Sequence, residues 1–547
     1  MRCLSLSKNC GLSPSRLAAW GMLALVGAGS GCSDGSKGAI ETFRNPPEIS
    51  SSDGELRVKL TVAESTVEVA GQWVTTTVYN RSYTPPLLRV RPGDTLHLEL
   101  DNRSNAPTNE HYHGMNVSPR INADGTASDD IFVHAAPGTK INYKVAIPST
   151  HNAGLYWYHS HQHGSAEQQV MGGLSGGLLV EGLTEPLQRL AGITERVMLL
   201  KDIQITPDGR VPADIDSSAP TNRTVNGQTN PTLVIAPGET QLLRIGNLSA
   251  NLYYRLQLGG HTLYELARDG NRHTQLVASD EILLAPGSRS EVLIQGAAPG
   301  IYALKTLDID TGPQGDTATE TILATVVSQG EAREPLALST VLLPPVEDFR
   351  TLPIARKRTI TFSESADGNT FFIDSGNGNG PVQFDHNRVD TTIVSGTVEE
   401  WTVLNPTGEW HVFHIHQTDF QVVEVDGVPQ PFIGHQDNVN VAFQTDGSSP
   451  PGQVKLLIDF RNPLMIGKFA YHCHILEHED GGMMGVAQVV PGPAQLAARR
   501  SSQAPGASGG MSAMFKSLLG RFAQQPRPLD GDAMAALQEA NVCRVSP

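Results

Sequence analysis

The chain has 547 residues, of which 39% are hydrophobic and 18% charged, a globular composition long enough for several domains. Its 54 glycines and 36 prolines break the apolar runs into short pieces, which favours many strands joined by turns over long helices. The net charge of −16 argues against nucleic acid as a partner. We therefore expect a mainly β protein.

Residues 1–32 are predicted to be an export signal. Basic residues precede the apolar run LAAWGMLALVGAGSGC, which is too short to span a bilayer permanently. Its end, Gly31-Cys32, is similar to a bacterial lipoprotein cleavage site, although Gly29 stands where such sites usually carry leucine. We expect a protein of the bacterial periplasm or cell envelope, either attached to the membrane through a lipidated Cys32 or released by ordinary cleavage. Residues 33–54 are expected to be a linker.

Three related segments then divide the chain. Each is a strand, a glycine turn and an alternating strand that ends in asparagine: LLRVRPGDTLHLELDN from Leu87, TLVIAPGETQLLRIGN from Thr232 and DTTIVSGTVEEWTVLN from Asp390. This repetition predicts three β-sandwich domains, which we place at residues 55–185, 186–345 and 346–492. Residues 493–547 are rich in Ala, Ser, Gly, Gln and Pro and are expected to form a flexible tail, in which Cys543 has no assigned role.

A second repeated theme follows each of these segments, and its copies differ in their histidines. The themes are GLYWYHSH from Gly154, GIYALKT from Gly300 and GKFAYHCH from Gly467. Five residues after the shared glycine stand His159 and His472 in the outer copies, but Lys305 in the middle one. The middle domain is therefore expected to provide spacing and support rather than chemistry.

Four His-x-His pairs occur at equivalent places in the two outer domains. Residues i and i+2 of a strand share a face, so each pair presents two imidazoles on one side. Eight such imidazoles meeting at a domain interface would hold a cluster of transition metals. The pairs are His111/His113, His159/His161, His414/His416 and His472/His474. Eight other histidines are expected to be solvated or hydrogen-bonded without a metal role: His97, His134, His151, His163, His261, His273, His386 and His435.

Cys473 lies between His472 and His474, so on a strand its sulfur points to the opposite face and serves a different metal. With His411, His478 and a weak thioether from Met483, it supplies the ligand set of blue copper. Met484 is the alternative thioether.

These motifs resemble those of the three-domain multicopper oxidases, which include laccases and copper-efflux oxidases, over about Leu56 to Pro491. The resemblance implies three consecutive cupredoxin-like Greek-key sandwiches and four copper ions: one type-1, one type-2 and two type-3. It implies His411, Cys473, His478 and Met483 as type-1 ligands, and His111 with His414 as type-2 ligands. The type-3 ligands would be His113, His159 and His474 on one copper and His161, His416 and His472 on the other.

The same resemblance implies oxidation of a donor by single electrons and reduction of dioxygen to water. Glu479 matches the family's proton-donating acid, and Asp124 is similar to a second one, although a turn role for an Asp before glycine is the alternative. Glu409 and Trp410, just before His411, would line the donor pocket or serve only in packing.

We expect phenols or aromatic amines as donors, with cuprous, ferrous or manganous ions as the alternative substrates. The 11 methionines form no Met-rich insert of the kind that copper-efflux oxidases carry for cuprous ion. A second class of function is a non-catalytic copper-binding or structural cupredoxin protein, which copper content and colour would distinguish. The chain is expected to be a monomer.

Overall fold

The computed structural model describes residues 41–496, except positions 188, 214, 217 and 494. The expected export signal with Cys32, and nearly all of the expected tail with Cys543, lie outside the described residues. Within the part that is described, no helix combines the length and the apolar character that a membrane crossing requires.

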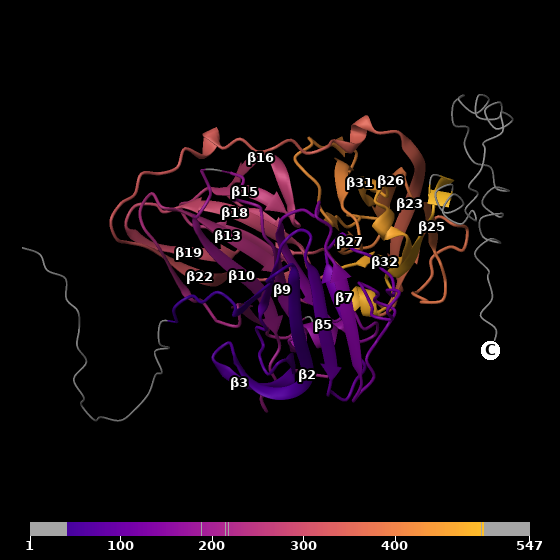
Figure 1. The fold of residues 1–547 in the computed structure, drawn as a ribbon, viewed down its shortest axis with the longest axis horizontal. Coiled ribbons are helices and arrows are strands. Elements are labelled where there is room, and N and C mark those ends of the chain that lie inside the picture. The colour runs from indigo at the N-terminus through magenta and orange to yellow at the C-terminus, as the bar shows by residue number, and fades with distance from the viewer. Residues whose placement is uncertain (1–40, 188, 214, 217, 494, 497–547) are drawn as a thin grey trace, which may run out of the picture. The chain divides into compact units, whose positions relative to one another are not determined.

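The described strands form six larger sheets in three consecutive pairs, which Figure 1 shows in successive colours along the chain. The first pair consists of β1 (Glu48–Ser50), β4 (Leu87–Val90), β9 (Ser175–Val180), β8 (Gly154–His159) and β6 (His111–His113) in one sheet, and β3 (Gln72–Tyr79), β2 (Glu55–Val69), β5 (Thr95–Asn102) and β7 (Lys140–Ala146) in the other. Alternate residues of β2 and β5 are buried between these two sheets, as expected for a sandwich.

The middle pair follows the same plan. One sheet has the order β11 (Asn222–Val225), β10 (Thr194–Ile203), β13 (Thr240–Asn247), β18 (Arg289–Gln295), β15 (Leu263–Arg268), β16 (Asn271–Ser279), and the other has β12 (Thr232–Ile235), β22 (Thr321–Ser328), β19 (Gly300–Thr306), β14 (Tyr254–Leu258), β17 (Ile282–Leu284). A short hairpin of β20 (Ile309–Asp310) and β21 (Thr317–Ala318) stands apart from both sheets.

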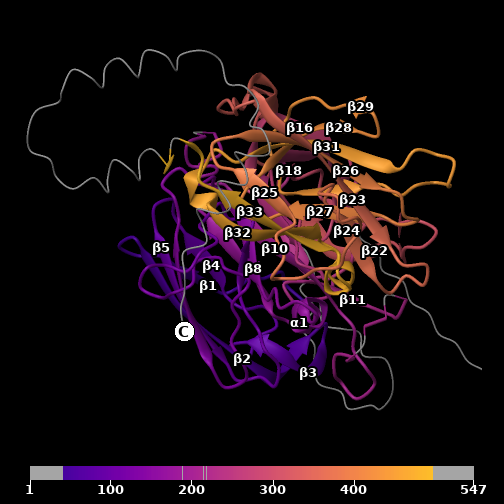
Figure 2. The same cartoon turned by 90° about the vertical axis from the view of Figure 1, so that its right-hand side faces the viewer.

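The third pair completes the described chain. Its sheets have the orders β24 (Phe371–Asp374), β23 (Ile354–Glu364), β26 (Val398–Asn405), β31 (Gly452–Asp459), β28 (Phe420–Val425), β29 (Val428–Pro429) and β25 (Thr391–Val394), β33 (Met484–Val490), β32 (Gly467–Cys473), β27 (His411–Ile415), β30 (Asn438–Val441). Helices are few: α1 (Ala166–Gly172), α2 (Leu476–Asp480) and the 3-10 turns Leu338–Thr340, Phe349–Thr351 and Pro463–Met465. Figure 2 shows β32, which ends in Cys473, between β33 and β27.

The three repeated segments adopt one structure. In each, the strand before the glycine turn joins one sheet and the strand after it joins the other, as β4 and β5 do. The terminal asparagines Asn102, Asn247 and Asn405 are buried, and each donates its side-chain amide to one carbonyl of the loop that follows and to a second carbonyl further along the same sandwich. The all-β prediction and the three consecutive sandwiches are confirmed.

Part of the expected linker is ordered sheet. β1 runs parallel to β4, and Thr42 forms a bridge with Thr232 of the middle sandwich. Residues 33–54 therefore do not form a simple spacer, because their second half adds a strand to the first sandwich. The sequence did not indicate this strand, because all three of its residues are exposed and so show no alternation of apolar and polar side chains.

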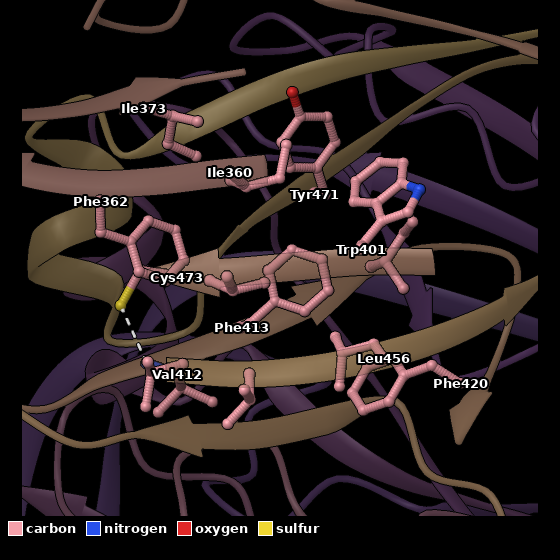
Figure 3. Packing of buried hydrophobic residues seen from close by; sticks show 14 of the residues in the cluster. Ile360, Phe362, Ile373, Trp401, Val412, Phe413, Phe420, Leu456, Tyr471 and Cys473 are labelled. Carbon is pink, nitrogen blue, oxygen red and sulfur yellow. Dashed lines mark hydrogen bonds between the residues drawn. The ribbon is translucent and has the colours of Figure 1, made fainter. Parts of the chain in front are cut away.

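The third sandwich has an aromatic core that surrounds Cys473. Trp401, Phe413 and Tyr471 pack together there, and the Trp401 and Tyr471 rings meet edge to face with centroids 5.4 Å apart (Figure 3). Trp401 is fully buried and donates its indole N–H to Glu399 over 3.0 Å. This packing fixes the strand that carries the cysteine.

Replacing Trp401 with alanine should destabilise the third sandwich by about 3–5 kcal/mol, because it leaves a large cavity and removes the indole hydrogen bond to Glu399. Urea unfolding of the metal-free protein, followed by circular dichroism, measures the shift. Trp73→Ala is the control, since Trp73 is 69% exposed and should change stability by less than about 0.5 kcal/mol. Equal midpoints for the two variants would contradict the packing described.

Candidate metal centre

Strand pairing brings the histidine motifs together in each outer sandwich. β6 runs antiparallel to β8, so His111 lies opposite His159. β27 runs antiparallel to β32, so His414 lies opposite His472. The second imidazole of each motif lies beside the first: His113 is on the same strand as His111, whereas His161, His416 and His474 lie one or two residues past the ends of β8, β27 and β32.

The two outer sandwiches meet at these motifs. The rings of His111 and His416 stack with centroids 3.9 Å apart, and those of His113 and His414 stack at 4.0 Å. The possible ligand atoms fall into four buried groups, within 4.8 Å of one another in each: His111, His113 and His414; His113, His159 and His474; His161, His416 and His472; and His411, Cys473 and His478. The structure thus gathers the residues into the expected sets, with His113 adjoining the His111/His414 pair as well.

The hydrogen bonds of these histidines leave nitrogens free to bind a metal. His111 Nδ1 lies 3.0 Å from Asp129 Oδ1, and His414 Nδ1 lies 2.8 Å from the carbonyl oxygen of Asp437. Among the described residues, Nε2 of both histidines and of His159 is buried without a hydrogen-bond partner. A buried imidazole fixed at one nitrogen and unpaired at the other is the usual arrangement of a metal ligand.

Electrostatics favour the same conclusion. Burial, strengthened in most cases by neighbouring imidazoles, lowers the pKa of all eight histidines in the His-x-His pairs, to about 3 for His159 and about 4 for His472. Neutral imidazoles are the form that binds a metal. Several unprotonated nitrogens also approach one another closely, as His416 Nε2 and His472 Nε2 do at 3.1 Å, and a shared cation explains such a contact.

Cys473 points away from this cluster into the core of the third sandwich. Its Sγ lies 3.7 Å from His411 Nδ1 and 3.6 Å from His478 Nδ1, and it accepts the Val412 N–H over 3.4 Å (Figure 3). Burial raises the pKa of the thiol to about 12, so a bound metal is needed to stabilise the thiolate. The cysteine and two histidines therefore form a site suited to a soft metal such as copper.

The two methionine candidates occupy different environments. Met483 belongs to the same buried hydrophobic cluster as Cys473. Its backbone N–H donates over 2.9 Å to the carbonyl of His478, which belongs to the same ligand group as Cys473. Met484 packs instead with Ile131 and Ala470 at another face. The structure favours Met483 as the thioether beside the mononuclear site.

The carboxylate candidates are placed differently from one another. Glu479 is fully buried between the imidazoles, with Oε1 3.3 Å from His161 Nδ1 and Oε2 3.1 Å from His472 Nδ1. Burial raises the pKa of Glu479 well above its ordinary value, which favours the protonated acid over the carboxylate.

Asp124, in contrast, lies in a turn with its side chain 48% exposed, bonded to Thr126 and Lys144 rather than to a histidine. The turn alternative is what the structure shows. The acid beside the first histidine motif is instead Asp129, which sequence reasoning missed: it contacts His111 and accepts the Gln417 amide over 2.7 Å. Asp129 lies in a loop, 18 residues after His111, where no repeating pattern in the sequence indicates a role at the cluster.

The eight histidines without an expected metal role lie outside the four groups in the described residues. His163 packs against Phe384, and His151 is hydrogen-bonded by Asn152 and Asn116. Tyr112, between His111 and His113, is buried in the core of the first sandwich and so points away from the cluster.

Met483→Leu should raise the reduction potential of the mononuclear copper and alter its blue absorption, because leucine offers no thioether to stabilise the oxidised ion. A redox titration followed by the blue absorption measures this. Met484→Leu is the matched control and should leave the potential unchanged. A shift of the reduction potential in Met484→Leu but not in Met483→Leu would show that Met484, and not Met483, supplies the thioether.

The comparisons with known proteins agree with this geometry. Three family models, each described as multicopper oxidase, match residues 61–185, 157–331 and 352–493. The multicopper oxidase mco of Staphylococcus haemolyticus is 28% identical over 423 residues, 75% of this chain and 83% of that protein. The cell division protein FtsP of Escherichia coli is 29% identical over 434 residues, 76% of this chain and 85% of its own length.

A solved structure, described as a multicopper oxidase from Campylobacter jejuni and a metallo-oxidase, matches with a TM-score of 0.68 at 24% identity, covering 82% of this chain and 95% of that one. This match supports the cupredoxin-like assignment of the three sandwiches. The family models together span more than half of the sequence. The chain therefore belongs to the three-domain multicopper oxidases, a family of oxidoreductase enzymes.

Proposed function

We propose that the protein couples four one-electron oxidations of a reducing donor to the four-electron reduction of dioxygen to water. The observation that carries this proposal is the position of Cys473, whose sulfur lies in the mononuclear group while its neighbours His472 and His474 lie in the histidine cluster. A short covalent path of peptide units thus joins the two groups.

The residues fit four copper ions. His411, Cys473, His478 and Met483 would hold the type-1 ion, His111 and His414 the type-2 ion, and the two remaining sets of three histidines the type-3 pair. When bound, copper would supply electron acceptance at the first group and oxygen reduction at the cluster. The chain itself keeps the imidazoles neutral and fixed, excludes water by burial, and provides protons.

Glu479 is placed to deliver those protons. Its two oxygens face Nδ1 of His161 and His472, which belong to one three-histidine group. Oxygen reduction consumes protons, and a buried carboxylic acid within hydrogen-bond reach of the ligands is a short route for them. Asp129 occupies a similar position beside His111 on the other side of the cluster.

The donor is best placed at the mononuclear group. A cavity of about 610 Å³ reaches Trp410, the residue just before His411, and is also lined by Arg255, Leu283 and the β20–β21 hairpin. Its volume suits a small aromatic molecule, and its walls from Leu283, Ile309 and Trp410 are apolar. These features favour phenols or aromatic amines.

Metal-ion oxidation is the second candidate, and a specific observation supports it. Oxygens of Glu364 and Glu409 lie within 4.8 Å of each other and of a ring nitrogen of His411. Glu409 Oε1 also lies 3.3 Å from His478 Nε2. Two carboxylates beside the ligand imidazoles would attract a cuprous, ferrous or manganous ion.

A structural role without copper is the remaining alternative, since relatives include proteins named for cell division. The full set of ten histidines and one cysteine, buried with unpaired nitrogens, argues for metal binding instead. We also propose an exported, monomeric protein of the periplasm or cell envelope, supported by the N-terminal signal pattern, with lipidation of Cys32 as a further proposal.

Glu479→Gln should lower oxygen turnover by roughly 100-fold or more, because the amide cannot supply a proton to the cluster. Oxygen uptake measures turnover, and the blue absorption should stay intact because Cys473 is untouched. Glu477→Gln is the matched control from the exposed face of α2 and should keep wild-type turnover. Unchanged turnover in the Glu479 variant would remove it from the mechanism.

Trp410→Ala and Glu364→Gln should separate the two donor classes. Loss of the indole should weaken phenol oxidation by about 2- to 10-fold in kcat/KM, the range expected for a lost aromatic contact. Loss of the Glu364 charge should lower kcat/KM for metal ions and leave kcat/KM for neutral phenols unchanged. Oxygen-uptake kinetics with phenols, aromatic amines and cuprous, ferrous and manganous ions test this; a Trp410 variant defective only toward metal ions would contradict the favoured donor.

A further inference from the structure

A buried ion pair joins the histidine-free middle sandwich to the third one. Arg289, the first residue of β18, donates Nη1–H to Asp437 Oδ1 over 2.7 Å and Nη2–H to Oδ2 over 2.6 Å. Both side chains are fully buried. Such a paired contact is among the stronger and more directional hydrogen-bonded arrangements in proteins, and lysine cannot reproduce its geometry.

Asp437 in turn contacts two histidines of the cluster. Its Oδ1 lies 3.3 Å from His113 Nε2, and its backbone carbonyl lies 2.8 Å from His414 Nδ1. His113 presents its other nitrogen, Nδ1, to His474 Nε2 at 3.2 Å, so Nδ1 is the nitrogen that a shared metal would use. Asn438 Nδ2 also lies 3.0 Å from His113 Nε2 and donates to Asp437 Oδ1 over 2.8 Å. Asp437 therefore contacts both imidazoles at the nitrogen turned away from the metal position, His113 through Oδ1 and His414 through its carbonyl.

The middle sandwich also fixes the backbone around Asp437. Asp269, in the turn between β15 and β16, accepts the Arg289 N–H over 2.8 Å at one oxygen. Its other oxygen accepts the backbone N–H groups of Asp437 and Asn438, each over 3.3 Å. Arg289 Nε–H further donates to the Leu155 carbonyl of β8 over 3.2 Å. One guanidinium thus contacts all three sandwiches.

Two glycines leave room for this arrangement. A Cβ on Gly114, the residue after His113, would overlap Arg289 Nη2 and lie 2.5 Å from Asp437 Oδ2. A Cβ on Gly287, two residues before Arg289, would lie 2.9 Å from the His474 ring. Both glycines have positive φ, so any side chain there would also strain the backbone.

We propose that Arg289 is a positioning residue for the histidine cluster: it holds Asp437 so that Asp437 orients His113 and His414 toward their metals. This role rests on the proposed copper binding. It assigns to the middle sandwich, which supplies no ligand, a direct part in shaping the trinuclear site. The Arg289 guanidinium acts through Asp437, and among the described residues it makes no hydrogen bond to a ligand imidazole.

Arg289→Gln tests the proposal in the full chain. The variant should bind the trinuclear copper ions about 10- to 100-fold more weakly in a chelator competition, the usual effect of losing a partner of the ligands. Its non-blue paramagnetic resonance signal should change, while the blue absorption from the Cys473 site remains. Arg244→Gln is the matched control: Arg244 is also buried in the middle sandwich, pairing Glu195 and Glu291 at 2.6 Å each, and should leave both signals unchanged.

Arg289→Lys keeps the charge without the paired hydrogen bonds and should show intermediate copper loss. Wild-type affinity and resonance in Arg289→Gln would overturn the proposal. Two further results would overturn it if Arg289→Lys behaved as wild type. One is an equal loss of the blue and non-blue centres in Arg289→Gln, and the other is failure of Arg289→Gln to fold. A wild-type chain that takes up no copper would instead overturn the proposed function, and this role with it.

Discussion

The geometry of the site depends on the alternation of side chains along β32. Cys473, the last residue of β32, enters the aromatic core of the third sandwich, whereas His472 before it and His474 just after the strand enter the seam with the first, because successive residues of an extended chain point to opposite faces. One strand can therefore serve two metal groups without a loop between them. A shift of one residue in its pairing with β27 would exchange the two faces and turn Cys473 and His472 away from their groups.

Burial of so many imidazoles explains why the surroundings matter as much as the ligands. Eight neutral rings have lost their hydration, six of them with a buried nitrogen that has no hydrogen-bond partner among the described residues, and a polar group buried without a partner costs free energy. Backbone carbonyls and carboxylates compensate at one nitrogen of several rings, as Asp129 does for His111 and Asp437 for His414. A metal ion at the other nitrogen completes the pairing, which makes metal binding and the stability of the seam mutually dependent.

The sequence predicted the ligand groups well because a simple rule governs them: His-x-His on a strand, repeated in two related sandwiches. It predicted less well where contacts join loops that are distant in the chain. Asp124 lay closer to the first motif than Asp129, yet only Asp129 turns toward His111. Arg289 and Asp437 are separated by 148 residues and belong to different sandwiches, so no local pattern could pair them.

The central claim is that this chain binds a blue copper through Cys473 and a cluster of copper ions through its histidines. The most direct measurement is the copper content and visible absorption of the purified full chain after loading with copper and removal of the excess. The account predicts about four copper ions per chain and a strong blue absorption that disappears on reduction. A colourless protein that retains no copper would contradict it.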